Sequence, residues 1–274
     1  MKNLRKGLIA MLILTLLLLV SGNSAFAGGE VDTSPERFDS ADFTNSEFIT
    51  NHWWTLPAGD NFLYFAEGED GCEWNLVQVL AATTSNFVGP IYGGTSARII
   101  LDRAWLDEEC VYDNFTDAYS NLDTEETTYD WYAQDSEENI WYMGEDTVDS
   151  EGSSEGSFVA GCDGAEAGIV LLGTQDKGAY YQQEFYEDEA EDVGKVLTFL
   201  DIDGLDCVKT KEWTPLETGH NEHKFYCTDG TDGELVKIDE IKGKTVVVDL
   251  IARNVAPVPG TPAGPPFMIP SCAP

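Results

Sequence analysis

A mainly β fold, an antiparallel sheet built from successive hairpins with one or two short helices, is predicted for this chain on three observations. Short runs rich in β-branched and aromatic residues recur between Gly, Asp and Asn clusters. Sustained helical periodicity is scarce. Six cysteines follow a secretion leader, and disulfides stabilise such folds in oxidising compartments.

The N-terminus has the three parts of a secretion signal. Positive residues up to Lys6 precede an apolar run at 8–20, and the small-x-small pattern Ala25-Phe26-Ala27 follows. A retained membrane anchor is the alternative, but the run is shorter than the roughly 20 apolar residues that a span needs. We expect residues 1–27 to be a signal peptide and the mature chain to be secreted or periplasmic, without a membrane span.

The charge balance is strongly acidic. The chain has 50 Asp and Glu against 15 Lys and Arg, a formal charge of -35, and loss of the three basic residues of the leader makes it -38. This excess argues against nucleic acid or anionic lipid as partners, because both require a basic face. We expect cations, or a basic or hydrophobic ligand, as partners. A solvated acidic surface that keeps an exported protein soluble is the simpler explanation of the charge.

The chain divides into four parts by composition. After the leader, residues 28–51 are polar and aperiodic, which predicts a flexible N-terminal arm. A single β-rich domain is expected over 52–253, because aromatic residues make up 11% of the chain and hydrophobic residues 42%. Residues 254–274 hold seven of the eleven prolines and predict an extended C-terminal tail.

The individual elements follow from the same patterns. Two segments are helix candidates, 116–126 and 187–196, the second because of its acidic start. The expected strands are 62–66, 74–82, 97–106, 127–134, 140–143, 180–186, 196–202, 207–213, 223–227, 235–241 and 245–251.

Two hairpins can be predicted with their register. A turn centred on Glu137 puts Tyr132 opposite Tyr142, an aromatic cross-strand pair. Cys207 and Cys227 are equidistant from residue 217, so a hairpin centred there makes them neighbours and predicts a disulfide. The pairing of Cys72, Cys110, Cys162 and Cys272 stays open, with Cys72 to Cys110 the shortest closure.

Calcium is the ion that the acidic segments favour, since it binds carboxylate oxygens. Asp201, Asp203 and Asp206 form a shortened calcium-type loop without the distal Glu, and a Gly-containing turn between strands explains this segment equally well. A second group of candidate ligands lies in the acidic run before the next strand: Glu187, Asp188, Glu191 and Asp192.

Catalytic patterns are weak by comparison. The segment 152–156 matches G-x-S-x-G, but acidic residues precede it where a nucleophile elbow requires an apolar strand, so a turn is expected. Strand alternation would send His220 and Glu222 to one face and His223 to the other, which divides a metal site. Carboxylates near Trp131 and Trp141 could form a glycosidase pair, yet no pair stands out.

Four segments resemble a group of exported bacterial proteins: 53–59, 129–147, 160–170 and 212–217, which include the stretches Trp53-Trp54, Tyr129 to Asp135, Trp141 to Thr147 and Glu212 to Glu217. The resemblance covers roughly residues 53 to 240 and brings no activity with it. It implies a curved antiparallel sheet, similar to periplasmic half-barrel proteins that shelter hydrophobic ligands or lipoproteins. This chain departs from the group in its six cysteines, its Asp201–Asp206 turn and its Pro-rich tail.

The sequence therefore predicts a secreted, non-catalytic, acidic binding protein that uses calcium-binding loops or a curved sheet. The alternatives are a carboxylate-based polysaccharide hydrolase and a surface or matrix assembly protein that self-associates through its tail and edge strands.

Overall fold

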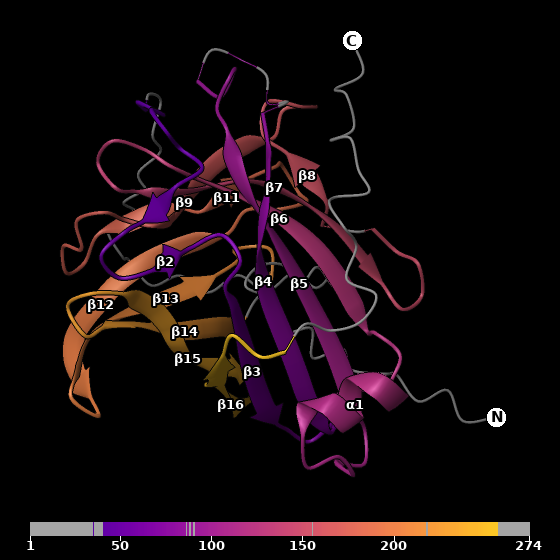
Figure 1. The fold of residues 1–274 in the computed structure, drawn as a ribbon. Helices are drawn as coiled ribbons and strands as arrows, with labels where there is room; N and C mark the ends of the chain where they lie inside the picture. The colour runs from indigo at the N-terminus through magenta and orange to yellow at the C-terminus, as the bar shows by residue number, and fades with distance from the viewer. Residues whose placement is uncertain are drawn as a thin grey trace, which may run out of the picture.

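The computed structural model describes residue 35 and residues 41–256, except residues 86, 88, 90, 155 and 218. The predicted signal peptide, most of the predicted arm and nearly all of the tail lie outside these residues. Strands account for 55% of the described residues, and one curved sheet of 13 strands is nearly closed (Figure 1). The prediction of a mainly β, antiparallel, curved sheet is confirmed.

The described residues contain one helix and sixteen strands. Their bounds in chain order are β1 Ile49–Thr50, β2 Thr55–Leu56, β3 Asn61–Glu67, β4 Cys72–Thr84, β5 Ala97–Asp107, α1 Phe115–Asn121, β6 Glu126–Gln134, β7 Ile140–Asp149, β8 Phe158–Val159, β9 Glu166–Leu171, β10 Tyr180–Gln182, β11 Glu184–Phe185, β12 Val193–Ile202, β13 Leu205–Trp213, β14 His220–Thr228, β15 Gly233–Lys242 and β16 Lys244–Arg253.

The sheet nearly closes on itself because its two end strands are consecutive in the chain. The hydrogen-bonded order is β10-β12-β13-β14-β15-β16-β3-β4-β5-β6-β7-β9-β11, with β8 paired to β7. Only Gln183 separates β10 from β11, and its Nε2 donates to the Val170 carbonyl of β9 at 3.3 Å. A Cβ at Gly168 would lie 2.5 Å from the Gln182 carbonyl oxygen, so a glycine is required for this close approach.

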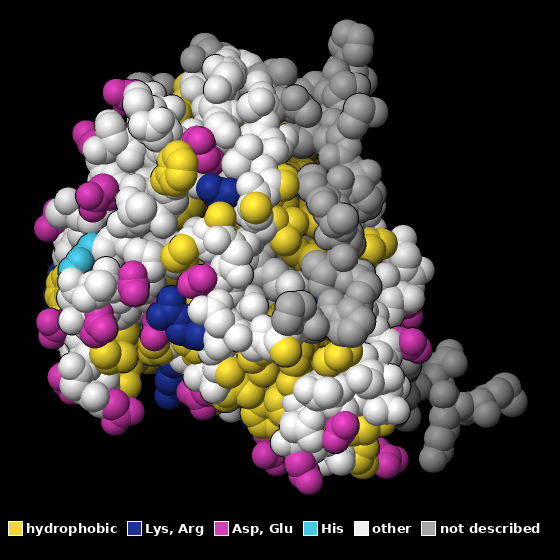
Figure 2. Space-filling model, in the orientation of Figure 1, with side chains coloured by type: hydrophobic (Ala, Val, Ile, Leu, Met, Phe, Trp, Pro, Cys, Tyr) yellow, Lys and Arg dark blue, Asp and Glu magenta, His cyan; other side chains and the backbone are white. Residues whose placement is uncertain are grey.

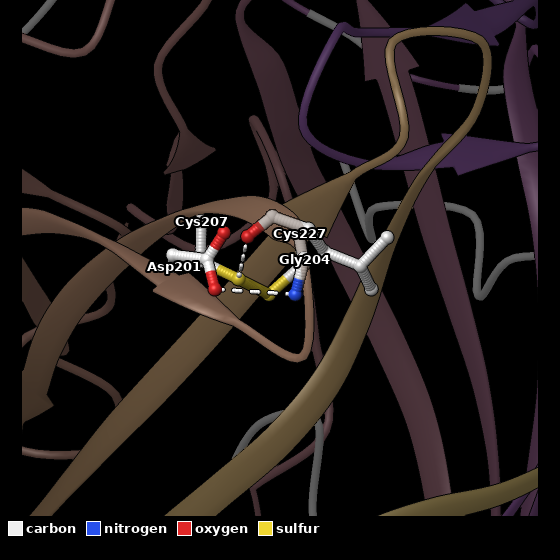
Figure 3. The surroundings of a disulfide bond; sticks show 5 residues. Asp201, Gly204, Cys207 and Cys227 are labelled. Atoms are coloured by element: carbon white, nitrogen blue, oxygen red, sulfur yellow. Dashed lines mark hydrogen bonds between the residues drawn. A yellow bond between two sulfur atoms is a disulfide. The ribbon is translucent and has the colours of Figure 1, made fainter.

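Both predicted hairpin registers are confirmed. Tyr132 faces Tyr142 across β6 and β7, with ring centroids 5.2 Å apart. Cys207 faces Cys227 across β13 and β14 and forms the predicted disulfide (Figure 3). A second disulfide joins Cys72 to Cys110, the shortest of the open pairings. Both bonds indicate folding in an oxidising environment.

Removal of the Cys207–Cys227 bond is expected to lower the free energy of unfolding by about 2 to 4 kcal/mol, because it releases a closed loop in the unfolded chain. Cys207→Ser/Cys227→Ser should therefore lower the urea midpoint and increase the slope slightly, because the released unfolded chain exposes more surface. Untreated wild-type protein gives the comparison, because a reductant would also open the Cys72–Cys110 bond. An unchanged midpoint in the double variant would contradict the stabilising role of this bond.

The first predicted helix forms only in part. α1 starts after Asn114, whose side chain accepts from the Asp117 N–H, and it ends at Leu122, where the backbone becomes extended. It buries Phe115 against Trp74 and Trp105, with ring centroids 6.2 and 5.3 Å away. The helix therefore covers an apolar cluster on the outer face of β4 and β5.

The prediction of a second helix at 187–196 is wrong. Tyr186 and Ala190 close a tight turn in which Asp188 has a φ of +62°, and β12 starts at Val193. Val193 and Val196 pair with β13, and the β-branched preference for a sheet outweighs the acidic start.

The end of the predicted arm is built into the body. Ile49 and Thr50 pair with β2, and the buried Asn51 side chain donates to the Glu138 carbonyl at 2.7 Å. Trp54, which is 2% exposed, lies 5.6 Å from both the Tyr132 and Tyr226 rings. The packed body therefore begins before His52, and β1 and β2 cover part of the interior of the curved sheet.

Within the described residues, no helix has the length and apolar character needed to span a membrane.

Candidate functional site

Three glutamates lie side by side on the inner face of the sheet. Glu212 of β13 is directly opposite Glu222 of β14, and Glu222 is directly opposite Glu240 of β15. Like charges placed opposite one another on adjacent strands are destabilising. We refer to Glu212, Glu222 and Glu240 as the glutamate row.

Among the described residues, Lys224 is the ammonium group that pairs directly with the row, and Lys242 acts on Glu240 from a greater distance. Lys224, which is 2% exposed, has its Nζ 2.6 Å from Glu212 Oε2 and 3.5 Å from Glu222 Oε2. Burial lowers the pKa of Lys224, but the neighbouring Glu212 and Glu222 outweigh it, and the pKa is raised above its usual value. Lys224 therefore stays charged, and the carboxylates around it outnumber it.

The acids around Lys224 hold their protons more tightly than usual. Burial and the neighbouring Glu222 raise the pKa of Asp192 to about 7. The same two causes raise the pKa of Glu240 to about 8. Burial also raises the pKa of Glu222, and Glu212 adds to the effect. Near neutral pH this cluster therefore changes its charge.

Solvent reaches the row from the end of the strands. β13 ends at Trp213, one residue after the row, and β14 starts at His220, two residues before it. The Glu222 side chain is 17% exposed. His220 lies beside this end, with its Nδ1 3.8 Å from Glu217. Glu222 is thus the member of the row with the most exposed side chain.

A deeper set of carboxyl groups is enclosed. Asp130 and Glu145 are cross-strand neighbours, each 1% exposed, and Glu184 is fully buried. Asp130 accepts a hydrogen bond from the Tyr142 hydroxyl at 2.8 Å, and burial raises its pKa to about 7. A polysaccharide does not reach carboxyl groups that are so enclosed. The pair Asp130 and Glu145 therefore gives no support to the polysaccharide hydrolase alternative.

The first predicted calcium segment is a hairpin turn. Asp203 and Gly204 have φ values of +52° and +88° between β12 and β13. The Gly204 N–H donates to Asp201 Oδ1 at 3.1 Å, and Asp201 pairs with Asp206 across the turn (Figure 3). These positive φ values are those of a two-residue hairpin turn, and the Asp and Gly residues satisfy them.

The second predicted segment lies at the other end of β12. The ten residues of β12 extend about 30 Å, so they keep the two acidic segments apart. Glu187 and Asp188 are exposed in the turn, and the Asp188 N–H donates to Glu191 Oε1 at 3.1 Å. Only Asp192 joins the cluster around Lys224. Within the described residues, no three His, Cys, Asp or Glu side chains are arranged to hold a metal ion.

The remaining sequence candidates do not form a site. His220 lies near Glu222 on the inner side, whereas His223 lies near Lys209 and Lys211 on the outer side, as strand alternation predicts. In the G-x-S-x-G segment, the Ser153 N–H donates to Asp149 Oδ1 at 2.7 Å in an exposed acidic turn.

Acidic side chains are spread over the face seen in Figure 2 instead of forming one patch. No protein-family model, curated protein or solved structure matches the chain. The glutamate row therefore has to be interpreted from its own chemistry.

Proposed function

We propose that this protein is a non-catalytic, extracytoplasmic binding protein that takes up an organic cation carrying amino groups at the glutamate row. The observation that carries the proposal is the row itself, three directly opposed glutamates with Asp192 beside them and, among the described residues, one ammonium, Lys224, in direct contact with the row. Such an excess of carboxylates is costly without a further positive charge. A bound cation supplies that charge.

The spacing of the row favours an extended cation. Neighbouring strands lie about 4.8 Å apart, so Glu212 and Glu240 are attached to backbones roughly 10 Å apart. A single calcium ion requires six to eight oxygen ligands at about 2.3 to 2.6 Å, whereas a chain of amino groups can meet the carboxylates one after another.

Spermidine is the probe for this site. We expect calorimetric titration to detect binding at about pH 9 and to find it at least tenfold weaker at about pH 5, because Asp192 and Glu240, with pKa values of about 7 and about 8, are then protonated. Parallel titrations use sodium chloride at equal ionic strength and calcium chloride. Binding of calcium but not of spermidine would overturn the proposal in favour of an inorganic ion.

Glu240→Gln is expected to weaken spermidine binding about tenfold and to raise the free energy of unfolding at about pH 9 by up to about 1 kcal/mol, because one like charge leaves the row. Glu187→Gln removes an exposed carboxylate from the nearby turn and serves as the control. Equal affinities for the two variants would contradict a role of the row in binding. Calorimetry and chemical unfolding measure the two effects independently.

A further inference from the structure

The strands that carry the glutamate row carry lysines on their opposite face. Successive side chains of a strand point to opposite sides of the sheet, so Lys209 and Lys211 of β13 lie outside when Glu212 lies inside. Lys195 of β12 is directly opposite Lys211. Lys237 of β15 is directly opposite Phe225, which is itself opposite Lys209. We refer to Lys195, Lys209, Lys211 and Lys237 as the lysine face.

Aromatic rings hold these lysines in place. Lys209 Nζ lies 4.8 Å and Lys237 Nζ 5.5 Å from the centre of the Phe225 ring. Lys211 Nζ lies 4.7 Å from the Trp213 ring, and Tyr180 stacks on Trp213 with centroids 5.4 Å apart and planes 3° apart. Cation–π contacts of this kind orient an ammonium group without removing its charge.

Carboxylates leave most of this face unneutralised, although the chain has 50 of them. Lys237 pairs with Asp239 at 3.1 Å. Among the described residues, no carboxylate oxygen lies within 4.0 Å of the ammonium groups of Lys195, Lys209 or Lys211. Burial and the neighbouring Lys209 lower the pKa of His223, which lies within the face. The face therefore presents a local positive charge on an acidic protein.

We propose that the lysine face binds a short carboxylated oligosaccharide. Directly opposed lysines such as Lys195 and Lys211 repel one another, and adjacent carboxylates on one ligand relieve that repulsion. Tyr180 and Trp213 are stacked beside them and half-buried, and the parts of these rings that Lys211 does not cover offer apolar surface to the sugar rings. One ligand class thus makes both contacts.

The net charge of the protein limits the length of this ligand. At physiological ionic strength the Debye length is about 8 Å, so charges on the rest of the surface are screened from a ligand that stays on the lysine face. A long polyanion would extend over the acidic surface around it. Nucleic acids bind by neutralising many successive phosphates, which requires a longer basic tract than four lysines provide.

Binding of tetragalacturonic acid, followed by calorimetry at about pH 7, tests the proposal. We expect saturable binding that weakens as salt is added, and no binding of an uncharged galactose tetramer. Lys195→Gln/Lys211→Gln should reduce the affinity at least tenfold. Lys244→Gln changes an exposed lysine at the β15–β16 turn and should leave the affinity unchanged.

Three outcomes would overturn the proposal: no binding of the acidic tetramer, equal affinities for the double variant and the control variant, or tighter binding of a short single-stranded DNA of equal charge. A thermal melt of each variant establishes that it is folded before titration. Neither lysine of the double variant contacts the glutamate row, so spermidine binding by the same variant reports separately on the cation site.

Discussion

Acidification from about pH 8 to about pH 5 is expected to stabilise this protein against unfolding. Burial raises the pKa values of Glu126, Asp130 and Asp192 to about 7 and that of Glu240 to about 8. An unfolded chain releases these protons near pH 4. Between these limits the folded protein holds more protons than the unfolded chain, so its stability is greatest at low pH and falls as the pH rises.

The size of the effect follows from the same shifts. One pKa unit corresponds to about 1.4 kcal/mol, and several groups are shifted by more than that. We therefore expect the free energy of unfolding to be at least about 1.4 kcal/mol larger at about pH 5 than at about pH 8, and the melting temperature to be at least about 3 °C higher. Urea unfolding, followed by tryptophan fluorescence at several pH values between about 5 and about 8, measures the free energy of unfolding.

Asp130→Asn isolates one contributor. The amide keeps an oxygen that can accept from the Tyr142 hydroxyl, but it cannot titrate, so the variant should be less sensitive to pH. Asp201→Asn, in the exposed β12–β13 turn, should leave the pH dependence unchanged. If the free energy of unfolding of the wild-type protein instead rose steadily from about pH 5 to about pH 8, the interior acids would be ionised in the folded protein and the prediction would be wrong.

Lys224→Met is expected to lower the free energy of unfolding at about pH 8 by about 3 to 5 kcal/mol. Lys224 Nζ is the ammonium group at 2.6 Å from Glu212 Oε2, and its removal leaves buried carboxylates uncompensated. The loss should be smaller at about pH 5, because Glu240, whose pKa is about 8, then takes up a proton. Urea unfolding at both pH values measures the two costs.

Lys242→Met is the matched control. Lys242 also pairs with a glutamate, Glu217 at 3.4 Å, but its side chain is 48% exposed. Ion pairs in such positions contribute about 0 to 1 kcal/mol. If the two variants lost equal stability, Lys224 would not be the compensating charge of the interior.

Much of the fold could be predicted from local patterns. The symmetric spacing about residue 217 gave the correct β13–β14 register, and the turn at Glu137 gave that of β6–β7. The segment 187–196 was misassigned because its acidic start is a local signal, whereas the pairing of β12 with β10 and β13 is not. Tertiary pairing outweighs local propensity in such cases.

Only part of the candidate site could be predicted from the sequence. The hairpin centred on residue 217 also places Glu212 opposite Glu222, so two members of the row could have been found. Glu240 could not, because a bulge between Phe225 and Tyr226 shifts the register of β15. The sequence groups Asp192 with Glu187, Asp188 and Glu191 as candidate ligands, and only the structure shows that Asp192 alone belongs to the cluster around Lys224.

The sequence by itself determined the antiparallel hairpins and two cross-strand contacts, because strand alternation and turn chemistry act over short distances. The tertiary structure alone decided that β10 and β11 bring the sheet close to closure, and that the face of β13–β15 that carries the glutamates is the inner one. Both depend on which strands become neighbours. That choice is made by the packing of the whole interior, which no local pattern encodes.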